Sequence, residues 1–294
     1  LDLDNLVYHT LVTGTTGVGK TTGVKALLAN CSKHNVPFLV VEPAKDEYRE
    51  LCGLAVNQQP VVRLQAGRQG VDCLRLNPLV FPEGHAVSLI EHIDRVCALF
   101  NAAFPMYAAM PQLLEEAIVQ AYEQKGWDTI TSKCRGGKRV FPTLSDVAEL
   151  VPSIVGKAGY EHEARSTYVG ALTTRLRSLM RGALGFTFMA QEEEETPPNI
   201  LFDSPCVVNV SGVGSPEKRA VLMGLLMIRL QEHRTIQGQQ GIDRLKHLVV
   251  LEEAHNILKR TASHTNMEIA NPQGQAVEYF ATRLQRCGHS VRES

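Results

Sequence analysis

The first residues of this 294-residue chain that could do chemistry form a glycine-rich run near its start. The segment GTTGVGKTT, residues 14–22, fits the pattern G-x-x-x-x-G-K-[ST] at every position. Glycines let backbone N–H groups turn inward around a phosphate, and a helix that begins at the lysine points its positive end at the same anion. The lysine would reach the β- and γ-phosphates, and the threonine after it would ligate Mg²⁺. The sequence therefore predicts a site for ATP and Mg²⁺ formed by Gly14, Thr15, Thr16, Gly17, Val18, Gly19, Lys20, Thr21 and Thr22.

A pair of acidic residues far along the chain supplies the other half of such a site. The apolar run LVVL, residues 248–251, ends in Glu252 and Glu253. In an ATPase the first acid helps to hold Mg²⁺ and the second polarises the attacking water. We therefore predict Thr21 and Glu252 as metal ligands and Lys20 and Glu253 as catalytic residues. Many buried strands end in carboxylates, so this motif alone is weakly diagnostic. It indicates an ATPase because a complete glycine-rich phosphate-loop motif precedes it. No Asn-Lys-x-Asp motif is present to select GTP.

The glycine-rich run lies in a predicted strand–loop–helix–strand order. Residues 6–13 (LVYHTLVT) are predicted as a strand, residues 20–34 as a helix, and residues 37–42 (PFLVVE) as a second strand. This order is a βαβ unit, whose crossover is right-handed. Because both strands are apolar on both faces, the sheet is expected to be parallel and covered by helices.

The middle of the chain changes to a helical pattern. Residues 86–104, 111–125 and 161–181 carry apolar side chains at helical spacing, and the segment TLSD at residues 143–146 resembles a capping box. Residues 191–199 (QEEEETPPN) are acidic and then proline-rich, which predicts an exposed loop.

The sheet pattern then returns. Residues 205–211 and 248–251 are predicted strands, and residues 216–233 form a helix that is apolar nearly all round and so buried. We predict an α/β fold with a mostly parallel sheet and an inserted helical lobe. The expected division is a first core part at 1–81, a helical insertion at 82–190 and a second core part at 191–294.

Composition narrows the function classes. Lys and Arg number 30 against 31 Asp and Glu, so any surface for nucleic acid must be local. The seven cysteines are scattered, odd in number and without a Cys-x-x-Cys pair, which indicates a reduced, cytoplasmic protein. The longest apolar run, residues 220–230, is too short for a membrane span and contains Arg229. Since the chain starts at Leu1 rather than Met, we expect it to be part of a longer protein.

Together these segments resemble the HerA/FtsK superfamily of RecA-like ring motors, especially the HerA branch and the related ATPases of conjugative type IV secretion. The resemblance lies in four segments: residues 9–22, 37–48, 209–234 and 251–256. It implies a RecA-like P-loop NTPase fold with the helical lobe inserted into it, and ATP hydrolysis in a homo-hexameric ring that moves double-stranded DNA. It also implies a nuclease or effector partner in DNA processing or antiviral defence. The family's usual first acid is Asp, and here it is Glu252, which has a longer arm.

Ring motors of this family complete each site with an arginine from the neighbouring subunit. Arg283 and Arg286 lie where the resemblance places an arginine-containing helix, although the local text ATRLQRCG departs from the family pattern. Such a finger stabilises charge on the transferring phosphoryl group. The alternative for both residues is a solvated helix face.

Two further polar groups are open to more than one interpretation. Glu42, Lys45, Glu47 and Tyr48 lie at the exit of the second strand, where Glu47 could orient water or belong to a polar turn. The cluster Arg175, Arg177 and Arg181 could contact DNA or a neighbouring subunit, or form a solvated face.

Three functions agree with these residues. The first is a DNA-translocating ATPase, the second is a secretion-type ATPase for protein or protein–DNA substrates, and the third is a nucleotide-gated scaffold for an effector.

Overall fold

A parallel sheet forms the centre of the fold. The computed structural model describes residues 3, 6, 10, 12–15, 17–43, 46–82, 86–104, 106–238 and 245–252. The described sheet has four parallel strands in the order β4-β7-β1-β8. In that order they are β4 (Val62–Gln65), β7 (Cys206–Asn209), β1 (Phe38–Glu42) and β8 (Leu248–Leu251). Every residue of β1 and β7 is buried, as expected for parallel strands covered on both faces. The predicted α/β class is confirmed.

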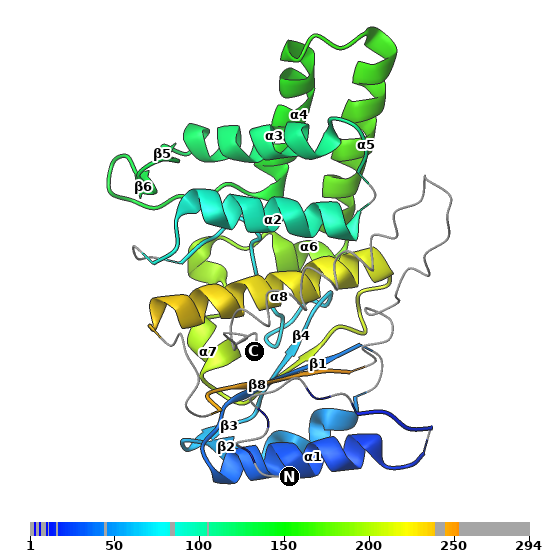
Figure 1. Ribbon diagram of the computed structural model, residues 1–294, viewed down its shortest axis with the longest axis vertical. Helices are drawn as coiled ribbons and strands as arrows, with labels where there is room; N and C mark the ends of the chain where they lie inside the picture. The colour runs from blue at the N-terminus through cyan, green and yellow to red at the C-terminus, as the bar shows by residue number, and fades with distance from the viewer. Residues whose placement is uncertain are drawn as a thin grey trace, which may run out of the picture.

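The sheet separates two apolar clusters. Leu39 and Val41 of β1 face the larger cluster, which includes the buried side of α8 (Pro216–Ile236). Phe38 and Val40 face the smaller cluster, which includes Leu28 and Cys31 of α1 (Lys20–Lys33). Figure 1 shows α1 below the sheet and α8 above it. Successive side chains of a strand point to opposite faces of the sheet, so alternate residues of β1 face α1 and α8 in turn.

Short elements accompany α1 on its side of the sheet. A 3-10 helix, η2 (Glu47–Gly53), follows β1, and a small hairpin of β2 (Ala55–Val56) and β3 (Gln59–Pro60) comes next. Val56 of β2 and Leu51 of η2 belong to the same cluster as Leu28 of α1. Within this layer η2 contacts both α1 and the strand β4.

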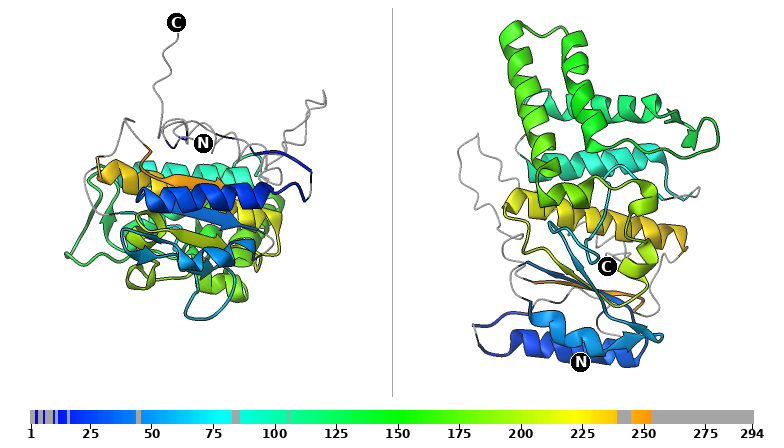
Figure 2. Two further views of the ribbon diagram at one scale, coloured as in Figure 1. Left: turned by 90° about the horizontal axis from the view of Figure 1, so that it is seen from below. Right: turned by 180° about the vertical axis from the view of Figure 1, so that it is seen from behind.

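Helices beyond α8 form further layers. Helix α2 (Leu89–Ala103) packs on α8, and α3 to α5 extend beyond it, as Figures 1 and 2 show from the front and from behind. The remaining elements are α3 (Met110–Gln124), β5 (Trp127–Asp128), β6 (Lys133–Cys134), α4 (Leu144–Lys157), α5 (His162–Met180), α6 (Ala183–Phe188), η3 (Glu192–Glu194) and α7 (Pro198–Phe202). The predicted capping box at α4 is confirmed, because Thr143 Oγ1 accepts from the Asp146 backbone N–H and Asp146 accepts from the Thr143 N–H.

The strand predicted at residues 6–13 is wrong at the positions of that segment that the structure describes. Leu6 lies in a 3-10 turn, and Thr10, Val12 and Thr13 are exposed and outside any strand. A buried parallel strand needs a neighbour for its backbone groups and helices over both faces. Val12 has no such cover, since it is 53% exposed.

The exposed loop predicted at residues 191–199 is only partly correct. It contains η3 and the start of α7, and the side chain of Glu195 is only 6% exposed because it pairs with the buried Arg229 of α8. Arg229 also donates to the Val80 carbonyl. A buried charge is stable only when it is paired, so Arg229 holds this acidic segment against the core.

A second buried ion pair joins α2 to α8. Glu232 Oε1 accepts from His92 Nδ1 at 2.9 Å and from Arg95 at 3.1 Å, and the side chains of Glu232 and His92 are fully buried. His92 Nε2 lies 3.0 Å from the Pro78 carbonyl oxygen. Both ring nitrogens of His92 therefore face oxygen acceptors, and both hydrogen bonds form only when each nitrogen carries a proton.

Candidate phosphate and magnesium site

The glycine-rich loop has the backbone that its sequence predicts. Gly17 and Gly19 have φ angles of 86° and 88°, in the left-handed region that glycine adopts without strain. A Cβ on Gly14 would lie 2.8 Å from Val18 Cγ2, so the loop closes on itself at that glycine. Larger residues at these three positions would open or strain the loop.

Helix α1 begins at Lys20 with its N-terminus open to an anion. Gly19 is the N-cap and makes no side-chain capping hydrogen bond, and no acidic residue lies in the first turn. The first N–H groups of a helix lack partners within it and carry the positive end of the dipole. Lys20 Nζ donates to the carbonyl oxygens of Gly14 at 2.8 Å and Thr15 at 2.9 Å, so its ammonium folds over the loop. The loop, the helix end and this cation together make an arrangement that is suited to an anion.

Four polar residues stand at the carboxyl ends of the four strands. The pairing register aligns Gln65, Asn209 and Glu42, and the Glu252 N–H donates to the Val41 carbonyl beside them. Because Leu39 and Val41 face α8, alternation turns Glu42 toward the α1 face. Val208 and Leu251 also pack on the α8 side, so Asn209 and Glu252, which follow them, turn toward the α1 face as well. The strand-end carboxylates therefore lie on the face that carries the phosphate loop's helix.

Glu42 is buried and fully bonded at this edge. It is 2% exposed, Oε1 accepts from the Glu47 N–H at 2.5 Å, and Oε2 accepts from Asn209 Nδ2 at 3.4 Å. Burial raises the pKa of Glu42, while the hydrogen bonds from Glu47 and Asn209 work against that rise. Glu42 thus ties the ends of β1 and β7 to the start of η2.

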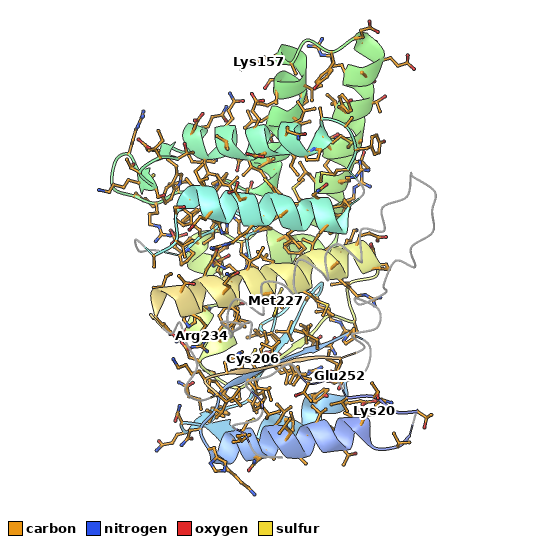
Figure 3. All side chains as sticks on the ribbon, viewed as in Figure 1. Lys20, Lys157, Cys206, Met227, Arg234 and Glu252 are labelled. Atoms are coloured by element: carbon orange, nitrogen blue, oxygen red, sulfur yellow. The ribbon has the colours of Figure 1, made fainter. Side chains whose placement is uncertain are left out.

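The Tyr48 hydroxyl on η2 donates to Glu252 Oε1. Tyr48 is 1% exposed. Burial raises the pKa of Tyr48 far above its ordinary value, and the neighbouring Glu252 adds to this rise, so the phenol stays a donor. Figure 3 shows the labelled Lys20 and Glu252 toward the same end of the sheet layer.

The donors present suit a magnesium–nucleotide pair. The Thr21 hydroxyl follows Lys20 at the start of α1, and Glu252 offers a carboxylate from the strand edge; both are hard oxygen donors of the kind that Mg²⁺ prefers. Mg²⁺ bound to nucleotides takes one or two protein oxygens and completes its shell with phosphates and water. In the ranges that the structure describes, no three His, Cys, Asp or Glu side chains gather into a metal cluster.

Several predicted site residues lie outside the described residues. These are Thr16, Glu253, Arg283 and Arg286. Of the basic cluster, Arg177 and Arg181 are exposed, whereas Arg175 is partly buried and donates to the Ala171 carbonyl.

Sequence reasoning missed Asn209 and did not pair Tyr48 with Glu252. The sequence could have identified Asn209, because it is the polar residue that directly follows the apolar run CVV, just as Glu42 directly follows the apolar run FLVV. The pairing of Tyr48 and Glu252 joins residues 204 positions apart, and no local pattern encodes it.

A parallel sheet flanked by helices, with a glycine-rich loop opening a helix toward its carboxyl edge, defines a P-loop NTPase. Comparisons with known proteins specify the family. The family model described as helicase HerA, central domain, matches residues 1–227, and the chain belongs to that family.

The structure is also similar to VirB4 of Thermoanaerobacter pseudethanolicus, with a TM-score of 0.56 and 17% sequence identity over 92% of this chain and 90% of that one. This likeness agrees with the RecA-like fold. No curated protein sequence matches the chain. Across the part of the chain with described coordinates, none of the helices has the length and hydropathy needed to cross a bilayer.

Proposed function

We propose that this chain hydrolyses ATP with Mg²⁺ and that the loop at residues 14–22 grips the triphosphate. The proposal rests on one observation: the open N-terminus of α1 with Lys20 and the strand-end Glu252 occupy the same face of the sheet. An anion site next to a carboxylate is what a magnesium–triphosphate pair requires, since the phosphates need cations and N–H donors while the metal needs oxygens.

Each residue then has a defined role. Backbone N–H groups of the loop hold the β-phosphate, and Lys20 exchanges the carbonyls of Gly14 and Thr15 for phosphate oxygens. Thr21 and Glu252 hold the metal, and Glu253 accepts a proton from the attacking water. When bound, Mg²⁺ would neutralise the negative charge that develops on the phosphoryl oxygens.

Family membership supports a finer proposal, that hydrolysis moves DNA through a homo-hexameric ring. In such a ring Arg283 or Arg286 would enter the neighbouring subunit's site and stabilise the transferring phosphoryl group. We propose double-stranded DNA as the substrate and a nuclease or effector as the working partner, in DNA processing or antiviral defence. A cytoplasmic location stays a prediction from the cysteine pattern.

We also propose that residues 82–190 are a helical lobe inserted into a core formed by residues 1–81 and 191–294. Helices α2 to α6 all fall inside that range, and they stack on the side of α8 that faces away from the sheet. The sheet takes its strands from before and after the range.

The experiment measures ATP turnover with and without double-stranded DNA, together with mass in solution in the presence of nucleotide. Lys20→Ala and Glu253→Gln should each abolish turnover, while Lys33→Ala, an exposed lysine in the last turn of α1, should leave it unchanged. DNA should stimulate the wild-type rate several-fold, and nucleotide should favour a hexamer. Turnover in Lys20→Ala at the wild-type rate would refute the proposed site.

The likeness to VirB4 favours a second candidate, a secretion-type ATPase that moves protein or protein–DNA substrates. Under this alternative ATP turnover would persist with little response to DNA. A nucleotide-gated scaffold would instead change its oligomeric state with ATP while turnover stayed negligible. The same two measurements therefore separate all three.

A further inference from the structure

The helix η2 connects the two halves of the proposed nucleotide site. At its start, the Glu47 N–H donates to the buried Glu42 at 2.5 Å, and beside it Asp46 pairs with Arg63 of β4 at 2.7 Å. At the next turn, Glu50 pairs with Lys25 of α1 at 2.8 Å. These contacts attach η2 both to the sheet edge and to the helix that follows the phosphate loop.

Tyr48 is the buried residue of this connection. Its side chain belongs to the cluster formed with Leu28 of α1, Val40 of β1 and Val207 of β7. From this fixed position its hydroxyl donates to Oε1 of Glu252 at the end of β8. The ring is held by packing while the hydroxyl holds a carboxylate that is only partly buried.

We propose that Tyr48 is a positioning residue that fixes the Glu252 carboxylate for the magnesium–nucleotide pair; this inference rests on the function proposed above. A glutamate has one more rotatable bond than an aspartate, so its carboxylate needs an additional contact to stay in one orientation. A hydrogen bond to one oxygen leaves the other oxygen available to the metal and its waters. Groups that orient metal-binding carboxylates in this way affect metal affinity by about 10- to 100-fold.

The test compares Tyr48→Phe with the wild-type chain in binding a fluorescent ADP analogue, once with Mg²⁺ and once with EDTA. Because Phe keeps the ring and its packing, affinity in EDTA should stay within about twofold of wild type. The increase in affinity that Mg²⁺ gives should fall by about tenfold. Equal losses with and without Mg²⁺ would mean a structural role only and would overturn the proposal, as would an unchanged Mg²⁺ increment.

Two further variants make the test specific. Tyr122→Phe removes another buried hydroxyl, one that donates to the Leu79 carbonyl in the helical layers, and it should leave the Mg²⁺ increment unchanged. In a Glu252→Ala background, Tyr48→Phe should have no further effect on the increment, because residues that act through one another are not additive. An undiminished effect of Tyr48→Phe in that background would overturn the proposal.

Failure of this inference is distinguishable from failure of the proposed function. If the wild-type chain bound no nucleotide, or if Lys20→Ala bound it equally well, both the proposed function and the role of Tyr48 would be refuted. If the wild-type chain bound nucleotide through Lys20 and Tyr48→Phe matched it in Mg²⁺, only the role of Tyr48 would fall.

Discussion

Removing the charge of Glu232, which links α2 to α8, should lower the free energy of unfolding more than a substitution of an exposed charge does. The Glu232 side chain is 0% exposed, and its Oε1 takes hydrogen bonds from His92 and Arg95, while Oε2 has no partner among the described residues. Loss of one member of a buried ion pair costs about 3–5 kcal/mol, because the remaining charge stays buried without compensation. Glu232→Gln keeps the volume and one acceptor, and Arg95 is 11% exposed and reaches some water. We therefore expect the lower end, about 3 kcal/mol.

Urea unfolding followed by circular dichroism at pH 7 measures this change. Glu123→Gln, an exposed glutamate on α3, is the matched control and should stay within about 0.5 kcal/mol of wild type. A loss below about 1 kcal/mol in Glu232→Gln would contradict this expectation, because it would mean that His92 and Arg95 find compensation without the Glu232 carboxylate.

The pH dependence of Glu232 gives a second readout. Burial alone would raise the pKa of Glu232, but His92, Arg229 and Arg95 outweigh it, so the pKa is lowered from its ordinary value of 4.5. A depressed folded pKa gives stability that is complete above the unfolded value and is lost as pH falls through the folded one. The difference between wild type and Glu232→Gln should therefore be fully present at about pH 5 and shrink in stronger acid.

Three other predictions follow from single positions. Gly19→Ala should cost about 1–2 kcal/mol in thermal unfolding because its φ is 88°, whereas Gly23→Ala, inside α1 with open space around a Cβ, should gain up to about 1 kcal/mol. Burial, with Arg234 and His233 adding to it, lowers the pKa of His247 to about 3, so the unfolded chain takes up that proton first and stability falls as pH drops below 6.5. His247→Phe should flatten this fall by up to ~1.4 kcal/mol per pH unit in urea unfolding at several pH values. Burial raises the pKa of Cys206 to about 12, so iodoacetamide at pH 8 should leave Cys206 unmodified in mass spectra until the sheet unfolds; labelling of the folded chain would contradict this.

The sequence predicts those parts of the fold and site that depend only on residues close together along the chain. The strands at residues 38–42 and 206–209 stand out as short apolar runs, and the cap at Thr143 is read from four residues. The strand expected at residues 6–13 had the same apolar character, yet Val12 is exposed there. A strand is defined by its partner, and composition does not specify the partner.

Short-range sequence is enough to predict the glycine-rich loop and the start of α1. Glycines with positive φ, a lysine and an uncapped helix N-terminus lie within a few residues, so local backbone preferences are enough to build a loop suited to an anion. The hydrogen bond from Tyr48 to Glu252 and the link between α2 and α8 through Glu232, by contrast, arise from tertiary packing. These contacts join distant segments, and they depend on the register of parallel strands and the packing of helices, which form only when the whole core is assembled.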